Sequence, residues 1–266
     1  MGARGKLYMK TRIIIIALFI TLANKSFSQT SEDDFYKMVV NVKTLTKLQN
    51  LKYEKYQVEL DFQEQLNLGI KQTNWKLYRK KSELEPYFLT LSFGDRILYS
   101  EVYKSIITED FTSLTTDLII SRTDSVLFEQ INSKSNDKNI EIKFSHLGRQ
   151  PIRSTFGYVC FAEASMPEEG LEMLKYVEYH NSEILIEWLQ SINPIKQVYG
   201  YLGLKLLESK TEYAIPIDIL AIMTDLKSSS IPIYSCSGCT IWEFIPINEL
   251  LNDSLVNQFI IDNIDN

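Results

Sequence analysis

The stretch from residue 181 to residue 206 constrains the fold of this chain more than any other. It reads NSEILIEWLQSINPIKQVYGYLGLKL, and its apolar residues recur every three or four positions on both sides of Asn193 and Pro194. This spacing is typical of amphipathic helices. Asn193 is a good helix N-cap, and Pro194 suits a first helical turn, where no amide donor is needed. The pattern therefore predicts two helices joined by a short turn.

Two glycines fall inside the second of these predicted helices. Gly200 and Gly203 each lower helix propensity by about 1 kcal/mol relative to alanine. A helix tolerates this cost where a neighbouring helix packs closely against the glycines. We therefore expect a tight helix–helix contact at Gly200 and Gly203.

An eight-residue motif occurs twice, 43 residues apart, as PIRSTFGY at 151–158 and PIKQVYGY at 194–201. Together with the helix–turn–helix pattern, this spacing resembles helical-hairpin repeats of the HEAT type, whose period is about 40–47 residues. The resemblance covers residues 139–227 and lacks the Asp and Arg that ordinarily mark such turns. It implies stacked helical hairpins, completed by helices from the N-terminal half.

The rest of the chain predicts further helices and one hairpin. Apolar residues at helical spacing predict helices over 31–48 and 57–84, whereas 86–145 is compatible with strands or short helices. The 10 glycines and 7 prolines are few for a sandwich or barrel of short strands. We therefore expect a mainly α fold with a short β-hairpin at 231–245. The polar run at 132–139 separates a mostly helical region, 29–131, from the repeat-like region, 139–266.

The N-terminus has the features of a secretory signal peptide. Basic residues precede the apolar run 13–23, and small residues Ser26 and Ser28 stand before Gln29. A run of 11 residues is too short for an ordinary membrane span, so an uncleaved anchor is the less favoured alternative. We expect cleavage before Gln29 and export to the periplasm or the exterior, without a membrane-spanning segment.

Removal of residues 1–28 makes the chain strongly acidic. Those residues hold five of the 28 Lys and Arg and none of the 34 Asp and Glu, which leaves 23 bases, 34 acids and a net charge of −11. A surface of this charge repels a phosphate backbone. We therefore expect no nucleic-acid partner.

Two of the three cysteines lie close together as Cys236-Ser-Gly-Cys239. Only 27 residues follow Cys239, too few for a thioredoxin-type sheet, and Thr240 stands where haem attachment needs histidine. Zinc would need two further ligands, and the sequence offers no second short-spaced pair. An exported protein meets an oxidising compartment, so we expect a structural Cys236–Cys239 disulfide across a turn and a buried free thiol at Cys160. A redox-active Cys236–Cys239 pair is the alternative.

No catalytic motif accompanies these features. The two histidines, His146 and His180, lie in no recognisable motif, and the chain contains no nucleophile elbow, P-loop or dinucleotide-binding string. The sequence therefore predicts no catalytic residue, metal site or cofactor. We expect a non-enzymatic module that binds a protein or a cell-envelope component. The alternative is a small secreted hydrolase with acidic residues in a cleft.

Overall fold

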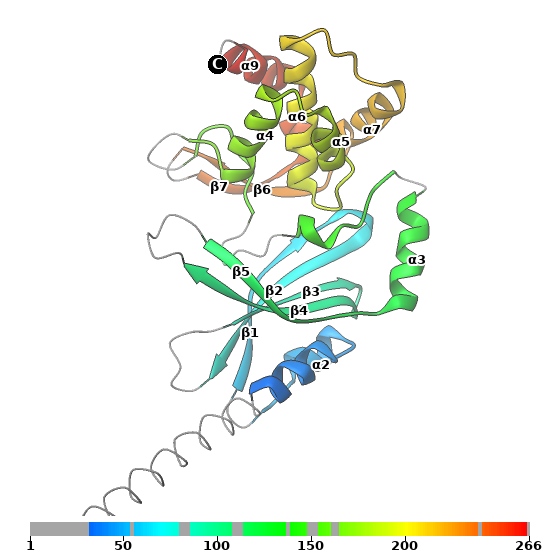
Figure 1. The fold of residues 1–266 in the computed structure, drawn as a ribbon, viewed down its shortest axis with the longest axis vertical. Helices are drawn as coiled ribbons and strands as arrows, with labels where there is room; N and C mark the ends of the chain where they lie inside the picture. The colour runs from blue at the N-terminus through cyan, green and yellow to red at the C-terminus, as the bar shows by residue number, and fades with distance from the viewer. Residues whose placement is uncertain are drawn as a thin grey trace, which may run out of the picture.

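The computed structural model describes residues 32–53, 56–79, 86–107, 114–136, 139–147, 154–160, 165–238 and 241–264. The expected signal peptide, its cleavage site and Cys239 lie outside these ranges. In the described residues, a β-sheet with flanking helices forms the N-terminal part, and a helical cluster with a β-hairpin forms the C-terminal part (Figure 1).

Five antiparallel strands follow one another in space as they do in sequence. Their bounds are β1 Tyr56–Gln65, β2 Ile70–Arg79, β3 Tyr87–Phe93, β4 Arg96–Ile107 and β5 Leu114–Thr123. The short helix η1, Asn67–Gly69, connects β1 to β2. Gly94 and Asp95 connect β3 to β4, and Gly94 has a φ of 59°, a backbone conformation that glycine adopts without strain.

The prediction of a mainly α fold is wrong, because this sheet occupies most of the region expected to be helical. Residues 57–84 have leucines at helical spacing, but they also contain the strand-forming residues Phe62, Thr73, Trp75 and Tyr78. The antiparallel register places Leu60 opposite Trp75 and Val58 opposite Leu77. Side-chain contacts between neighbouring strands therefore outweigh the local helical periodicity.

Helices cover both faces of the sheet. On one face, a helix over residues 32–40 and α2, Leu45–Gln49, bury Phe35, Val39 and Leu48 against Trp75 and Phe88. A second apolar cluster joins other residues of the sheet to Leu127 and Ile131 of α3, Ser125–Asn136. Residues 132–136, expected in a polar loop, are therefore the last turns of this helix.

The C-terminal part contains the predicted helix–turn–helix. Its helices are α4 Glu168–Glu178, α5 Ser182–Leu189, α6 Pro194–Lys210, α7 Ile217–Lys227, α8 Ile247–Leu250 and α9 Asp253–Asn263. The Asn193 side chain accepts a hydrogen bond from the Ile195 amide and caps α6, whose first residue is Pro194. Both helices and their turn are as predicted.

The packing at the two glycines of α6 is also as expected. A Cβ at Gly200 would lie 2.7 Å from the carbonyl oxygen of Leu185, and one at Gly203 would lie 2.6 Å from Cδ2 of the same leucine. At Gly200 the nearest atoms belong to the backbone of α5, so a larger residue has no room, whereas at Gly203 they belong to side chains. Because glycine has no side chain, α5 and α6 can pack closely.

The first copy of the repeated motif does not form a helix. Residues 151–153 lie outside the described ranges, and Phe156 forms a parallel bridge with Ser235 of β6, Pro232–Ser237. The expected HEAT-like stack is therefore not present in the residues that the structure describes. The motif occurs in two different environments, so its recurrence does not mark a structural repeat.

The hairpin consists of β6 and β7, Ile241–Pro246, which pair antiparallel over the stretch where a hairpin was expected. Residues 156–160 run along the other side of β6, where the Phe156 amide donates to the carbonyl of Tyr234 and the Gly238 amide to that of Val159. The hairpin is thus extended by a third, short segment from a distant part of the sequence.

Candidate functional site

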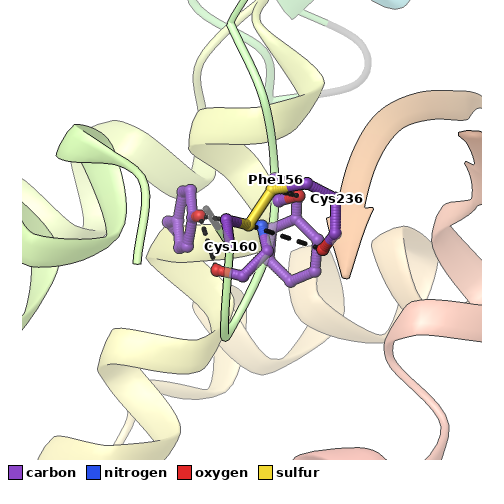
Figure 2. Close-up of a disulfide and its surroundings, with 5 residues drawn as sticks. Phe156, Cys160 and Cys236 are labelled. Carbon is purple, nitrogen blue, oxygen red and sulfur yellow. Dashed lines mark hydrogen bonds between the residues drawn. A yellow bond between two sulfur atoms is a disulfide. The ribbon is translucent and has the colours of Figure 1, made fainter. Parts of the chain in front are cut away.

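A disulfide between Cys160 and Cys236 connects this third segment to β6 (Figure 2). The two Cα atoms lie 5.6 Å apart, a usual distance for a disulfide. The structure therefore differs from the expected Cys236–Cys239 pair, and Cys160 is not a free thiol. Cys160 is buried as expected, but it lies on an extended segment and not on a helix.

No local motif indicates this pairing, because the two cysteines have a sequence separation of 76. The close spacing of Cys236 and Cys239 favoured the shorter loop. In the structure, hydrogen bonds of residues 156–160 to β6 bring the Cys160 backbone alongside Gly238, two residues from Cys236. The backbone pairing therefore determines which cysteine lies within reach.

The surroundings of the disulfide are closely packed. A Cβ at Gly157 would lie 2.7 Å from both Sγ and the carbonyl oxygen of Cys236. The fully buried hydroxyl of Tyr199 accepts a hydrogen bond from the Gly157 amide and donates one to its carbonyl, each 3.1 Å long. Phe156 lies beside the disulfide (Figure 2) and packs on Tyr199 with ring centroids 5.0 Å apart. These contacts fix the position of β6 on the helical cluster.

Strand β7 carries exposed aromatic side chains on this fixed base. Trp242 is 38% exposed and Phe244 is 53% exposed. Their rings lie 5.8 Å and 5.3 Å from that of Tyr234, which occupies the same face of the hairpin. We call Tyr234, Trp242 and Phe244 the hairpin surface. Ile241 is 52% exposed, but it lies on the opposite face of the hairpin and is not part of this surface.

A separate group of polar residues lies where the sheet meets the helices. His146, at the end of η2 (Phe144–His146), has Nδ1 at 3.0 Å from Ser191 Oγ and Nε2 at 2.8 Å from Glu187 Oε1. Lys143 forms an ion pair with the same carboxylate at 3.1 Å. Nearby, the amide of Asn67 on η1 donates to the Ile192 carbonyl. A hydroxyl, an imidazole and a carboxylate in contact are the components of a serine hydrolase triad.

The burial of Ser191 argues against that role. Ser191 has no exposed surface, and its Oγ accepts a hydrogen bond from the Asn193 amide at 3.0 Å. Its hydroxyl is therefore inaccessible to a substrate in this structure. This group was not predicted, because His146 and Ser191 lie 45 positions apart in sequence and no motif contains both.

Two ionisable groups on the helices nearby are also perturbed. Burial lowers the pKa of Lys196, whose Nζ lies 4.3 Å from the centre of the Trp188 ring. Burial raises the pKa of Glu169. Such opposite shifts occur in active sites and also in structural ion-pair networks. With Ser191 enclosed, we interpret this region as a buried polar junction between the two parts.

The junction predicts a specific pH dependence of stability. Burial lowers the pKa of His146 below its ordinary value of 6.5, although the contact with Glu187 opposes that shift. The unfolded chain therefore binds more protons than the folded one as pH falls below about 6.5, and folding becomes less favourable by at most about 1.4 kcal/mol per pH unit. We expect the free energy of unfolding, measured with urea, to decrease less between pH 7.5 and pH 5.5 for His146→Gln than for the wild type. His180→Gln is the control, since His180 is exposed, and an equal effect of both substitutions would contradict the assignment.

Neither a metal site nor a membrane span emerges from the part of the chain that the structure describes. No group of three or more His, Cys, Asp or Glu residues there is arranged to hold a metal ion. None of the helices described is long and apolar enough to cross a membrane.

Comparisons with protein-family models, curated proteins and solved structures found no match. The function must therefore be argued from the geometry.

Proposed function

We propose that this protein is an exported, non-enzymatic binding protein and that the hairpin surface contacts a protein partner. The single observation that carries the proposal is the exposure of neighbouring aromatic side chains on a rigidly held hairpin. Scattered apolar residues are common on protein surfaces, whereas grouped ones often mark interaction sites. Tryptophan and tyrosine also contribute strongly to binding energy at interfaces.

The rigid base of the hairpin supports the same proposal. Binding costs less conformational entropy when the contacting side chains are already held in position. The Cys160–Cys236 disulfide and the hydrogen bonds of residues 156–160 hold β6, and the rings of Trp242 and Phe244 pack against Tyr234 of that strand. Glu243 lies between them in sequence but points to the opposite face of β7, so a partner with an apolar patch is the best complement of the hairpin surface.

A site-specific photo-crosslink tests the proposal. p-Benzoylphenylalanine at position 244 keeps an aromatic side chain where Phe244 is exposed, and we expect a protein adduct of one defined mass in the cells that produce the chain. The control carries the same photoreactive residue at Tyr179, which is 75% exposed and lies at the C-terminal end of α4.

A second variant links the adduct to the neighbouring side chain. Trp242→Ser should lower the adduct yield about tenfold, because truncating a central interface aromatic commonly costs more than 1 kcal/mol. Equal adducts from positions 244 and 179, or an unchanged yield in Trp242→Ser, would contradict the proposed surface. An adduct to polysaccharide or lipid would replace the protein partner with a cell-envelope component.

The alternative of a small hydrolase would use the Ser191, His146 and Glu187 group. The contact distances favour it, but the enclosed hydroxyl of Ser191 does not. The binding function therefore has the stronger structural support.

A further inference from the structure

A hollow of about 450 Å³ is lined by residues of α4, α6 and α9. These helices lie in the upper part of Figure 1. Pockets that hold small molecules commonly measure about 300–1,000 Å³. The hollow does not include the hairpin surface or any residue of the His146 group. It is a separate feature of the helical cluster.

The apolar part of the lining comes mainly from α4. Leu171, Leu174 and Val177 line the hollow from this helix, and Leu206 lines it from α6. Val177 and Leu206 are buried, Leu174 is half-buried, and Leu171 is 45% exposed. The lining therefore passes from a buried apolar floor to a partly open apolar wall, which suits a short hydrocarbon chain.

The polar part of the lining includes two lysines. Lys175 of α4 and Lys210 of α6 contribute ammonium groups, whereas Glu178 is the only acid among the lining residues that the structure describes. Lys210 Nζ donates to the Asn263 carbonyl at 3.1 Å, which links α6 to α9 at the edge of the hollow. Lys175 is exposed and forms no ion pair with a described residue. In a protein of net charge −6, this local excess of positive charge favours a negatively charged group.

We infer that the hollow binds a single amphiphile with an anionic head group, such as a medium-chain carboxylate or alkyl phosphate. The alkyl chain lies on Leu171, Leu174 and Leu206, and the head group lies next to Lys175. Carboxylate and phosphate heads share this chemistry, since both accept charge-assisted hydrogen bonds from an ammonium group. This inference is independent of the proposed function of the hairpin surface.

Calorimetric titration of the full-length mature protein tests the ligand class. Decanoate and decyl phosphate, each below its micelle concentration, should bind with one molecule per chain, whereas decyltrimethylammonium should bind at least about tenfold more weakly. Equal binding of the cationic amphiphile, or no binding of either anionic one, would overturn the inference. Co-sedimentation with phosphatidylglycerol vesicles distinguishes a membrane surface from a free amphiphile, and vesicle binding without decanoate binding would also overturn it.

Two variants locate the site. Lys175→Glu should weaken decanoate binding about tenfold, because it replaces a charge-assisted hydrogen bond with a repulsion. Lys47→Glu makes the same change of charge on α2, far from the hollow, and should leave the affinity unchanged. An equal loss in both variants would indicate a general charge effect and contradict the site. Unchanged melting temperatures verify that both variants are folded, and the comparison of head groups on the wild type does not depend on either.

Discussion

Replacing Cys160 and Cys236 together with alanine is expected to lower the free energy of unfolding by about 4 kcal/mol. The disulfide closes a loop across a sequence separation of 76 residues, and loops of this size restrict the unfolded chain strongly. A loss of this size is a large share of the total stability of an ordinary domain. Urea unfolding of the oxidised wild type and the double variant measures it.

The third cysteine supplies the matched control. Cys239→Ser should leave stability within about 0.5 kcal/mol of the wild type, because it removes no bond between Cys160 and Cys236. The opposite pattern, with a large loss for Cys239→Ser and a small one for Cys160→Ala, would support the Cys236–Cys239 pair that the sequence favoured. Peptide mapping under non-reducing conditions identifies the pair directly.

Gly200→Ala is expected to destabilise the protein by roughly 2 kcal/mol, although alanine favours helix formation by about 1 kcal/mol over glycine. The new Cβ would lie 2.7 Å from the Leu185 carbonyl oxygen and close to the Leu189 amide, both of which are backbone atoms of α5. Backbone cannot rotate away as a flexible side chain can, so the two helices must separate. Thermal and urea unfolding measure the change.

Ser209→Ala is the control for the helix-propensity gain, because Ser209 is exposed on the same helix. The free energy of unfolding of the Ser209→Ala variant should stay within about 0.5 kcal/mol of that of the wild type. A stabilising effect of Gly200→Ala would contradict the close packing of α5 and α6 at this position.

Features of the fold that depend on neighbours in sequence could be predicted. The Asn193 cap, the Pro194 helix start and the contact at Gly200 follow from local chemistry and helical spacing, and all three are present. The sequence of the β3–β4 turn also contains a local signal for a hairpin. Gly94 and Asp95 stand between two apolar runs, a dipeptide typical of tight hairpins.

Features that depend on distant residues could not be predicted. The leucines of residues 57–84 fit a helix as well as a strand. The pairing of β1 with β2, the pairing of β2 with β3 and the burial of Trp75 favour the sheet. The contact of His146 with Ser191, like the Cys160–Cys236 bond, forms between segments that share no motif. The hairpin surface could not be predicted for another reason. The sequence indicates a hairpin, but it does not show which of the aromatic side chains in the hairpin are exposed.

The parallel pairing of residues 156–160 with β6 has a consequence for the order of folding. The five-stranded sheet is built from consecutive strands, so its pairs can form as the chain emerges. The backbone around Phe156 pairs with Ser235, which lies 79 positions later in the sequence. This pairing can form only after Ser235 has been synthesised. During synthesis, the C-terminal part therefore cannot reach its native arrangement until the chain has been made at least as far as β6. Contacts of such long range slow folding and leave apolar residues such as Phe156 exposed in the meantime.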